Sequence, residues 1–285
     1  MSTALSIQEV TDAQLARYAK LIYERTGIHV SPQKKTLLSN RLRRRLRATG
    51  IDSYEIYFKH LQGLAPNDAE WDAFLQEITT HETYLFRDMA QWDWFRDVFL
   101  KDIASVARAG KRPKTLRIWS AACSTGDEPH TIACCIADRI TDASRWQIEI
   151  LGTDIGTGAV AHARMAEFGQ RAMHLVPDGY RRRFFSKARD ETLWSAKEQL
   201  RSWTRFELHN LLEPLNEQPF DLVFLKNVLI YFDSQSKQRV IDNIRRVLAP
   251  KAYLVTSAAE GVANLLKDME HLSGWLHRTG KSQSA

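Results

Sequence analysis

Residues 118–133 read IWSAACSTGDEPHTIA, and this stretch decides the fold. An apolar strand ends in small residues, a tight turn follows over residues 124–126, and a helix begins at about Asp127. Small side chains allow a ligand to approach the backbone, and the first turn of a helix presents unpaired N–H groups. The stretch therefore predicts a turn that binds a nucleotide-like cofactor. It is neither a G-x-G-x-x-G fingerprint nor a phosphate loop, because Gly126 is its only glycine.

Acidic side chains follow this turn and the end of the next strand. Asp127 and Glu128 open the helix, where carboxylates would repel a pyrophosphate but suit the cationic amino group of a methionine moiety. Asp154 ends the strand in ILGTDI (150–155), a position from which a carboxylate commonly binds the ribose hydroxyls of an adenosine cofactor. The structural alternatives are that the first pair complements the helix dipole and that Asp154 caps the following helix. The order of the two strand ends favours a nucleoside cofactor.

Strands and helices alternate from about residue 115 onward. The periodicity predicts strands over 116–121, 146–154, 220–227 and 252–258, and helices over 127–141, 156–168 and 235–248. Such alternation is typical of a doubly wound α/β fold, an open, mostly parallel sheet with helices on both faces. Residues 180–209 fit less well, and their short aromatic pieces predict a small antiparallel β-subdomain inserted in the sheet domain. We expect the whole cofactor domain to span 101–285.

Residues 1–78 read as a small all-helical domain. Thr11 and Gln14 have the spacing of a capping box, and Gly27 and Gly50 are typical helix stops. The expected helices run over about 12–26, 31–49, 53–61 and 67–78. Four short helices of this kind can enclose a core of their own.

A third strand end carries polar residues. The stretch FDLVFLKNVLIYFD (220–233) begins as a buried strand, and Lys226 and Asn227 follow it directly, with Tyr231 one turn later. Ligand crevices in open α/β sheets lie at such strand ends. The alternative for Tyr231 is a ring packed against the protein with its hydroxyl in water. The preceding His-Asn-Leu-Leu at 209–212 could supply a loop on the adenine side.

Residues 79–100 are expected to form a linker between the two domains that contributes to the active site. Its segment THETYLFRD (80–88) holds Arg87 within an otherwise aromatic stretch. Arg87 is either a surface charge or, on a linker crossing the crevice mouth, a bidentate partner for a ligand carboxylate.

The net charge of +6 is concentrated near the N-terminus. The 285 residues include 40 Lys and Arg against 34 Asp and Glu, and residues 1–60 alone hold 11 basic and 5 acidic side chains. Residues 34–47 carry seven basic side chains and no acidic one, beside a leucine stripe that can pack inward. A charge run is commonly only a solvated face, but this one carries the whole excess and predicts docking of an acidic partner. The docking residues that we expect are Arg41, Arg44, Arg45 and Arg47.

The composition excludes several classes of protein. The chain is 44% hydrophobic and 26% charged, which is typical of globular domains, and no apolar run approaches the roughly 20 residues of a membrane helix. The N-terminus lacks the features of a secretion signal, so we expect a soluble, cytoplasmic protein without membrane insertion. The three cysteines form no C-x-x-C pair, and the histidines show no metal-ligand spacing. We therefore expect neither a disulfide framework nor a bound metal.

These motifs together resemble those of the chemotaxis receptor methyltransferases, the CheR family. The resemblance rests on five motifs in the family's order, HETYLFRD (81–88), IWSAACSTGDEP (118–129), GTDI (152–155), HNLL (209–212) and FLKNVLIYFD (224–233), and on NRLRRRLRATG (40–50), which is similar to its receptor-facing helix. It covers nearly the whole chain. It implies a Rossmann-like, S-adenosylmethionine-dependent enzyme that converts chemoreceptor glutamates to methyl esters and releases S-adenosylhomocysteine, without a metal.

The resemblance also implies roles for single residues. Cofactor contacts would come from His81, Thr83, Arg87, Glu128, Asp154, Asn210, Leu211, Lys226 and Asn227. Arg87 and Tyr231 occupy the positions that the family places beside the reacting methyl group. The partner would be the cytoplasmic methylation helices of a chemoreceptor, with a receptor C-terminal peptide as a candidate ligand of the β-subdomain, and we expect a monomer. His81 and Lys226 depart from the family pattern, which has Asn and Arg there.

Two other functions fit part of the pattern. The basic run would suit an RNA methyltransferase, but residues 226–229 read Lys-Asn-Val-Leu and not the Asn/Asp-Pro-Pro-aromatic segment of base-amine methylation, which disfavours nucleic acid. A non-catalytic protein that binds S-adenosylmethionine or its product is the second alternative, suggested by the departures at 81, 226 and 251–259.

Overall fold

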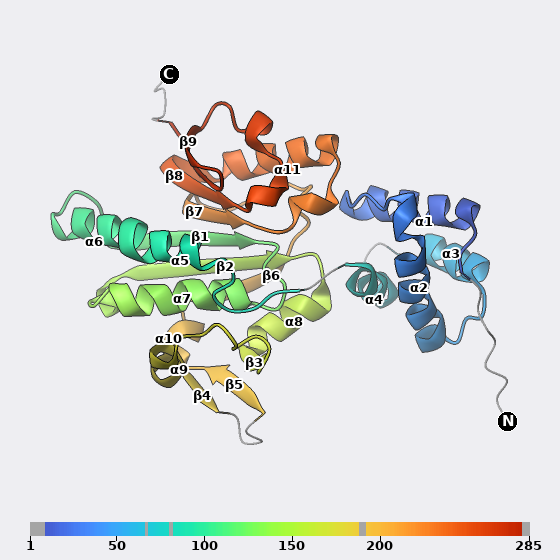
Figure 1. The fold of residues 1–285 in the computed structure, drawn as a ribbon, viewed down its shortest axis with the longest axis horizontal. Helices are drawn as coiled ribbons and strands as arrows, with labels where there is room; N and C mark the ends of the chain where they lie inside the picture. Colours follow the sequence, from blue (N-terminus) through green and yellow to red (C-terminus); the bar gives the residue numbers. More distant parts are fainter. Residues whose placement is uncertain (1–8, 66–67, 80–81, 188–191, 281–285) are drawn as a thin grey trace.

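A computed structural model gives the structure of residues 9–65, 68–79, 82–187 and 192–280. Figure 1 shows a helical N-terminal domain at one end of a large twisted sheet, with a small second sheet on the side of the larger domain. Among the described helices, none is long and apolar enough to cross a membrane.

The described part of the N-terminal domain consists of helices, as predicted. They are α1 (Asp12–Thr26), the 3-10 turn η1 (Pro32–Lys34), α2 (Lys35–Thr49), α3 (Tyr54–Gly63) and α4 (Ala69–Ile78). The capping box is confirmed: the Gln14 N–H donates to Thr11 Oγ1 (3.2 Å), and the Thr11 N–H donates to Gln14 Oε1 (2.9 Å). Gly27 and Gly50 end α1 and α2 with left-handed φ values of 73° and 72°. The predicted start of the fourth helix at residue 67 lies outside the described residues.

The predicted leucine stripe of α2 faces the core of this domain. Leu38, Leu42 and Leu46 are almost completely buried and pack in one cluster with Tyr18 and Phe74. Because one side of α2 is committed to this core, its basic side chains lie along the domain surface and beside α4. The helix α2 therefore presents basic side chains on one side and is anchored by its leucines in the core of the N-terminal domain on the other.

The larger domain is built on a seven-stranded sheet with the order β6-β2-β1-β7-β8-β10-β9. The strands are β1 (Thr115–Ala121), β2 (Gln147–Asp154), β6 (Thr204–Leu208), β7 (Phe220–Leu225), β8 (Leu248–Thr256), β9 (Glu270–Ser273) and β10 (Leu276–Arg278). The first five in this order are parallel, and β10 and β9 add antiparallel strands at one edge. The chain order reverses between β1 and β7, and such a switch point opens a crevice at the carboxyl ends of the strands.

Helices cover both faces of this sheet, which confirms the doubly wound α/β fold. One face packs on α5 (Met89–Trp94), the π-helical turn η2 (Phe95–Phe99), α6 (Leu100–Arg108) and α7 (Asp127–Arg139); the other packs on α11 (Ser234–Arg246). Neighbouring residues of one strand serve opposite faces, as with Val223 toward α11 and Phe224 toward α5, where Phe224 stacks on Trp92. Helix α8 (Thr157–Met165) packs beside β6.

The small antiparallel sheet exists, but its strands differ from the predicted span of 180–209. Its order is β3 (Glu167–Gly169), β5 (Leu193–Ala196), β4 (Phe185–Lys187), joined by α9 (Asp178–Phe184), with α10 (Glu198–Arg201) after it. The predicted helix over 156–168 ends at Met165, because Ala166 adopts a left-handed φ of 55° and releases the chain into β3. At the other end, 204–208 form β6 of the main sheet, where Phe206 packs so closely over Gly152 that a Cβ there would lie 2.7 Å from the ring.

The linker expected at 79–100 is only partly a linker. Residues 82–88 form no regular helix or strand, but Met89 begins α5, and the helical run continues through α6. Trp92 and Phe95 of this run are almost completely buried in the core of the sheet domain. The second half of the segment therefore belongs to the larger domain and anchors the residues that precede it.

Candidate active site

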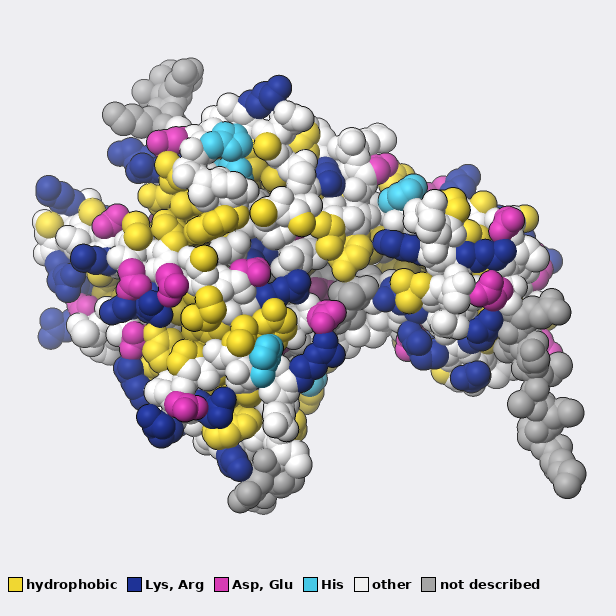
Figure 2. Space-filling model, in the orientation of Figure 1, with side chains coloured by type: hydrophobic (Ala, Val, Ile, Leu, Met, Phe, Trp, Pro, Cys, Tyr) yellow, Lys and Arg dark blue, Asp and Glu magenta, His cyan; other side chains and the backbone are white. Residues whose placement is uncertain are grey.

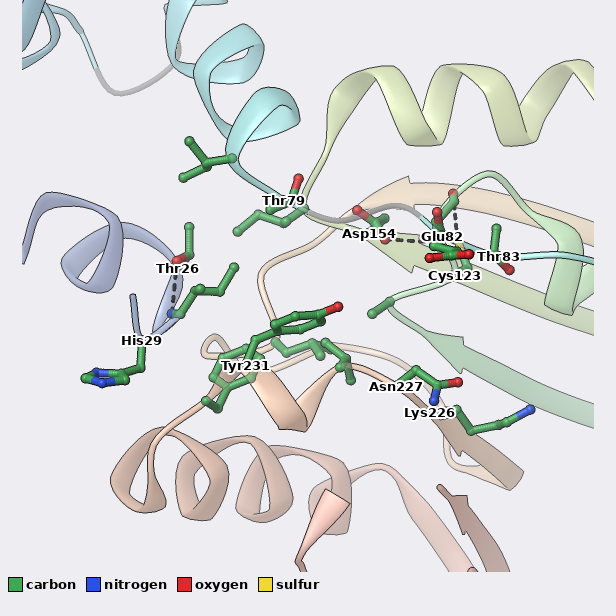
Figure 3. A pocket seen from close by; sticks show the side chains of 18 of the residues that line it. Thr26, His29, Thr79, Glu82, Thr83, Cys123, Asp154, Lys226, Asn227 and Tyr231 are labelled. Atoms are coloured by element: carbon green, nitrogen blue, oxygen red, sulfur yellow. Dashed lines mark hydrogen bonds between the residues drawn. The ribbon is translucent and has the colours of Figure 1, made fainter. Parts of the chain in front are cut away.

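A pocket of about 340 Å³ lies between the two domains at the carboxyl edge of β1, β2 and β7. Its lining from the sheet domain includes residues after all three of these strands, and the opposite wall comes from the end of α1 and from α2. Figure 3 shows the ring of Tyr231 extending across this pocket toward the side on which Asp154 lies. All three strand ends predicted to carry ligand-binding residues therefore meet in one cavity.

The turn after β1 has the backbone geometry that its small residues predicted. Ala122, Ser124 and Gly126 all have positive φ values, of 61°, 51° and 88°. Gly126 is required here, since a Cβ would lie 2.8 Å from the Cβ of Ala163 in addition to the unfavourable φ. Ala122 and Ser124 line the pocket, so the turn presents backbone to whatever binds there.

The two acidic residues that open α7 have different surroundings. Glu128 lines the pocket, and its Oε1 accepts a hydrogen bond from Ser120 Oγ at 2.8 Å. Asp127 is 1% exposed and turned away: its Oδ2 accepts from Thr125 Oγ1, and burial raises the pKa of its carboxyl group. The prediction that both carboxylates face a cationic ligand is therefore wrong for Asp127. Glu128 alone is placed for it.

Asp154 lies where the sequence placed a ligand-binding carboxylate, and it does not cap α8, whose N-cap residue is Gly156 without a side-chain cap bond. It lines the pocket at the end of β2, and it also accepts backbone hydrogen bonds from Ser124 N and Gly156 N, both at 2.9 Å. These bonds join the two strand-end turns to each other. Charged hydrogen bonds of this kind fix a carboxylate in one orientation.

Lys226 is held by groups of the protein itself. Its side chain is 3% exposed, and Nζ lies 3.3 Å from Asp88 Oδ2 and 3.5 Å from Glu128 Oε2, over the face of Trp92. A buried ammonium needs such compensation, which two carboxylates and an aromatic ring supply. In this chain Lys226 thus ties the 82–88 segment to the start of α7.

Asn227 and Tyr231 both line the pocket. Asn227 has a left-handed φ of 57°, which Asn tolerates better than most residues, and Tyr231 ends the 3-10 turn η4 (Leu229–Tyr231). The Tyr231 carbonyl accepts a hydrogen bond from the His29 N–H (2.8 Å), and Lys34 Nζ lies 5.5 Å from the centre of its ring. The N-terminal domain therefore contacts this part of the site directly.

Arg87 and Thr83 lie on the irregular segment before α5, and both line the pocket. Arg87 Nη1 donates to the carbonyl of Glu82 at 3.0 Å. The segment is fixed on each side of Arg87, because Phe86 N donates to Thr131 Oγ1 and the Arg87 carbonyl accepts from Trp92 Nε1. His81, the remaining predicted cofactor residue of this segment, lies outside the described residues.

Of the predicted cofactor residues Asn210 and Leu211, Leu211 lines the pocket and Asn210 does not. The side chain of Asn210 donates from Nδ2 to the carbonyl of Arg25 (2.9 Å) and accepts from Leu212 N. Asn210 therefore fastens the end of α1 to the sheet domain.

The N-terminal wall of the pocket was not predicted from the sequence. Ile22, Thr26 and Ile28 contribute to it, and Tyr23 donates to Asp233 Oδ2 at 2.9 Å behind it. Gly27 carried the only signal, since a Cβ there would lie 2.9 Å from Leu212 Cδ1 as well as adopting a positive φ. In the sequence, that glycine was explained fully by its role as a helix stop.

The four arginines proposed for docking differ in their contacts. Arg44 and Arg47 are exposed, with Arg44 Nε 2.5 Å from Glu77 Oε2. Arg41 lines the pocket and donates to the Ile78 carbonyl, and burial, followed by the nearby Arg44, lowers its pKa. Arg45 binds Glu70 through two hydrogen bonds, with only 16% of its side chain exposed. Figure 2 shows basic side chains over the visible face of this domain and on both sides of the hollow beside it.

Because Arg45 is committed to Glu70, its replacement should act on stability. We expect Arg45→Ala to lower the free energy of unfolding by about 2 kcal/mol, since Glu70 keeps a partly buried charge without its bidentate partner. Urea denaturation measures this change. Arg47→Ala on the same helix is the control, with an expected change below about 0.5 kcal/mol. Equal losses in the two variants would contradict the structural role.

The pocket suits a nucleoside cofactor with a positively charged tail. Carboxylates stand at two neighbouring strand ends, the intervening turn exposes backbone, and apolar residues such as Leu211 complete the wall. In the described part of the chain, no group of three or more His, Cys, Asp or Glu side chains is arranged to hold a metal ion. A doubly wound sheet with such a pocket at its switch point defines the class of Rossmann-like enzymes that bind an adenosyl cofactor.

Comparison with protein families narrows this class. Residues 81–275 match the CheR methyltransferase SAM-binding domain, and residues 13–79 match the CheR methyltransferase all-alpha domain. The chain belongs to the CheR methyltransferase family, and its larger domain is an S-adenosylmethionine-binding methyltransferase domain. The two matches meet at the segment that was predicted to link the domains.

Curated relatives agree over most of the chain. It is 31% identical to a chemotaxis protein methyltransferase of Salmonella typhimurium, covering 91% of this chain and 87% of the relative. It is 30% identical to the chemotaxis protein methyltransferase of Escherichia coli over 90% and 87% of the two chains. Identity to chemotaxis protein methyltransferase 2 of Vibrio cholerae is 28%, over 95% and 93%.

Proposed function

We propose that this protein transfers the methyl group of S-adenosylmethionine to glutamate side chains of chemoreceptors, giving methyl esters and S-adenosylhomocysteine. The observation that carries the proposal is the pocket itself: carboxylates at two strand ends suit the cofactor, and the opposite wall belongs to the helical domain that carries the basic helix α2. The names of the relatives support a chemotaxis substrate. The proposal assigns the protein to the cytoplasm, as a monomer.

The cofactor residues that we propose are those that the pocket brings together. Glu128 would bind the amino group of the methionine moiety, Asp154 the ribose hydroxyls, and Leu211 the adenine side. Thr83, Arg87, Lys226 and Asn227 complete the set, and Lys226 Nζ also lies 3.5 Å from Glu128 Oε2. When bound, the cofactor supplies an electrophilic methyl group on a sulfonium.

The acceptor makes few chemical demands on the protein. A glutamate carboxylate is already ionised at neutral pH, so it needs no general base to attack a methyl carbon. The protein must instead desolvate this carboxylate and hold it in line with the methyl–sulfur bond. Both Arg87 and Tyr231 line the pocket, where Arg87 would steer the substrate carboxylate or hold that of the cofactor, and Tyr231 would fix the geometry through its hydroxyl group.

Docking on α2 is a second part of the proposal. Arg44 and Arg47 are exposed on the helix, and Arg41 lies where its face meets the pocket. An acidic receptor helix lying along this face would be guided electrostatically toward the pocket. Arg45 is left out of the docking set because of its bond to Glu70.

We expect Arg44→Glu to lower the rate of receptor methylation about ten-fold at low salt, with a smaller effect at high salt, because steering between charges is screened. The affinity for S-adenosylhomocysteine should be unchanged. Methylation rates over a salt series and calorimetry measure the two quantities. Lys20→Glu is a matched control, since it also sets two carboxylates side by side on the surface of this domain, at Glu24. Equal loss of cofactor affinity and methylation would point to misfolding.

The β-subdomain is the proposed site for a receptor C-terminal peptide. Strand β4 is at the edge of the small sheet, next to β5, where Trp194 lies beside Arg181 and Lys187. An extended peptide could add to such an edge through backbone hydrogen bonds.

Labelled S-adenosylmethionine incubated with receptor-containing membranes and with RNA tests the function as a whole. Base-labile label on the receptor is the expected result, because a methyl ester hydrolyses in base. Label on RNA would instead indicate an RNA methyltransferase. Cofactor binding without transfer would indicate a non-catalytic binding protein.

A further inference from the structure

Glu260 is a buried carboxylate beside the pocket that has no part in the mechanism above. It ends the 3-10 turn η5 (Ala258–Glu260) after β8, and it is completely buried. Its Oε1 accepts hydrogen bonds from Val228 N (3.2 Å) and Ser257 Oγ (3.0 Å). Its Oε2 is buried and has no hydrogen-bond partner among the described residues. Burying a carboxyl group costs free energy unless hydrogen-bond donors compensate for the lost water, so the donors that face Glu260 must hold it in place.

The backbone donor, Val228 N, belongs to a chain segment that carries three pocket residues, Asn227, Val228 and Tyr231. Val228 lies between Asn227, with its left-handed backbone, and the turn η4 that ends at Tyr231. Burial raises the pKa of Glu260, while the hydrogen bonds from Ser257 Oγ and Val228 N oppose this rise. The carboxylate thus holds the Val228 peptide group of this segment. It supports a segment that begins at Asn227 in a left-handed conformation.

Glu260 is itself fixed in place. Its carbonyl accepts a hydrogen bond from Lys237 Nζ of α11 at 2.7 Å, and its N–H donates to the Ser257 carbonyl. At the far end of the supported segment, His29 N holds the carbonyl of Tyr231. The 227–231 segment is therefore held at one end by the sheet domain and at the other by the N-terminal domain.

We propose that Glu260 is a positioning residue for methyl transfer, whose carboxylate holds the Val228 peptide group of the 227–231 segment and thereby sets Asn227 and Tyr231 at the pocket. The inference rests on the proposed function for the roles of these two residues. Glu260 does not line the pocket, so it acts through them.

The test compares Glu260→Ala with Asp221→Ala. Asp221 is a matched control, because it is also a carboxylate that accepts a backbone N–H, that of Arg117 at 3.0 Å, but at the opposite end of β7. Three quantities are measured: amide hydrogen exchange of the peptide covering 226–232 without ligand, affinity for S-adenosylhomocysteine, and kcat at saturating S-adenosylmethionine. The exchange measurement requires no activity.

Glu260→Ala should speed exchange at the Val228 amide about ten-fold or more and lower kcat about ten-fold, with a smaller loss of cofactor affinity. Glu260→Gln, which keeps an acceptor oxygen, should restore most of both. Asp221→Ala should lower the melting temperature but leave exchange at 226–232 and kcat as in the wild type.

The inference is overturned if Glu260→Ala exchanges and turns over like Asp221→Ala. Should Glu260→Ala not fold, Glu260→Asp takes its place: the shorter side chain draws the carboxylate away from Val228, and unchanged exchange would again overturn the inference. If the wild type binds no S-adenosylhomocysteine, the proposed function fails, and the exchange comparison still decides whether Glu260 holds the segment.

Discussion

Glu128→Gln is expected to lower the affinity for S-adenosylhomocysteine about a hundred-fold, which corresponds to about 2.7 kcal/mol. The substitution preserves the size of the side chain and its bond with Ser120, but it removes the negative charge proposed to bind the amino group of the cofactor. It also leaves Lys226 with Asp88 as its remaining carboxylate, so the ammonium of Lys226 would repel the incoming ligand. Isothermal titration calorimetry measures the change.

Glu217→Gln is the control for this prediction. Glu217 also pairs with basic side chains, Arg117 and Arg205, but it precedes β7 and lies at the end of the sheet opposite the pocket. We expect its loss to reduce stability without changing the affinity for S-adenosylhomocysteine. If Glu128→Gln binds this product within about two-fold of the wild type, the carboxylate does not face the amino group, and the assignment of the pocket is wrong.

Tyr231→Phe should lower kcat about ten- to a hundred-fold while the affinity for S-adenosylhomocysteine changes less than about two-fold. The ring extends across the pocket and its backbone is held by His29, so removing one oxygen leaves the fold and the ring position intact. What is lost is the hydroxyl group that we propose fixes the reacting geometry. Single-turnover methylation with saturating cofactor separates this effect from binding.

Tyr57→Phe provides the comparison. Its hydroxyl donates to Glu70 in the core of the N-terminal domain, so its removal should reduce stability but leave turnover unchanged. Normal turnover by Tyr231→Phe would remove Tyr231 from the mechanism and leave it as part of the pocket wall.

The strands that form the pocket could be predicted because each is an apolar run of strand length that ends at small or polar residues. β1 is an apolar run that ends in small residues, followed by a turn that requires glycine at position 126. This combination favours a strand followed by a tight turn over other local structures. β6 was assigned to the inserted subdomain, because the aromatic Phe206 is equally compatible with an excursion. Its parallel pairing with β2 and the packing of Phe206 over Gly152 place it in the main sheet. The start of α5 was not predicted. Asp88 stands at its N-cap position, but it has a left-handed backbone and its side chain makes no cap hydrogen bond.

The sequence likewise predicted the site residues at strand ends, but not the contacts between neighbouring elements. Strand-end residues such as Glu128 and Asp154 could be predicted because parallel strands present their carboxyl ends at one edge. The contacts of Arg45 with Glu70 and of Asn210 with Arg25 depend on which helices become neighbours, and no local pattern encodes that. The same holds for Glu260, whose partner Val228 is 32 residues away in the chain.

The hydrogen bond from His29 N to the Tyr231 carbonyl has a consequence for how this architecture can be recombined. A larger domain joined to a foreign helical domain would keep its cofactor residues, but it would support the residue proposed to align the reaction only if the foreign loop placed an N–H at the same point. Chimeras between relatives should therefore exchange the loop after α1 together with the loop after β7, because the two loops are hydrogen-bonded to each other. The loop after α1 and the loop after β7 therefore form one structural unit.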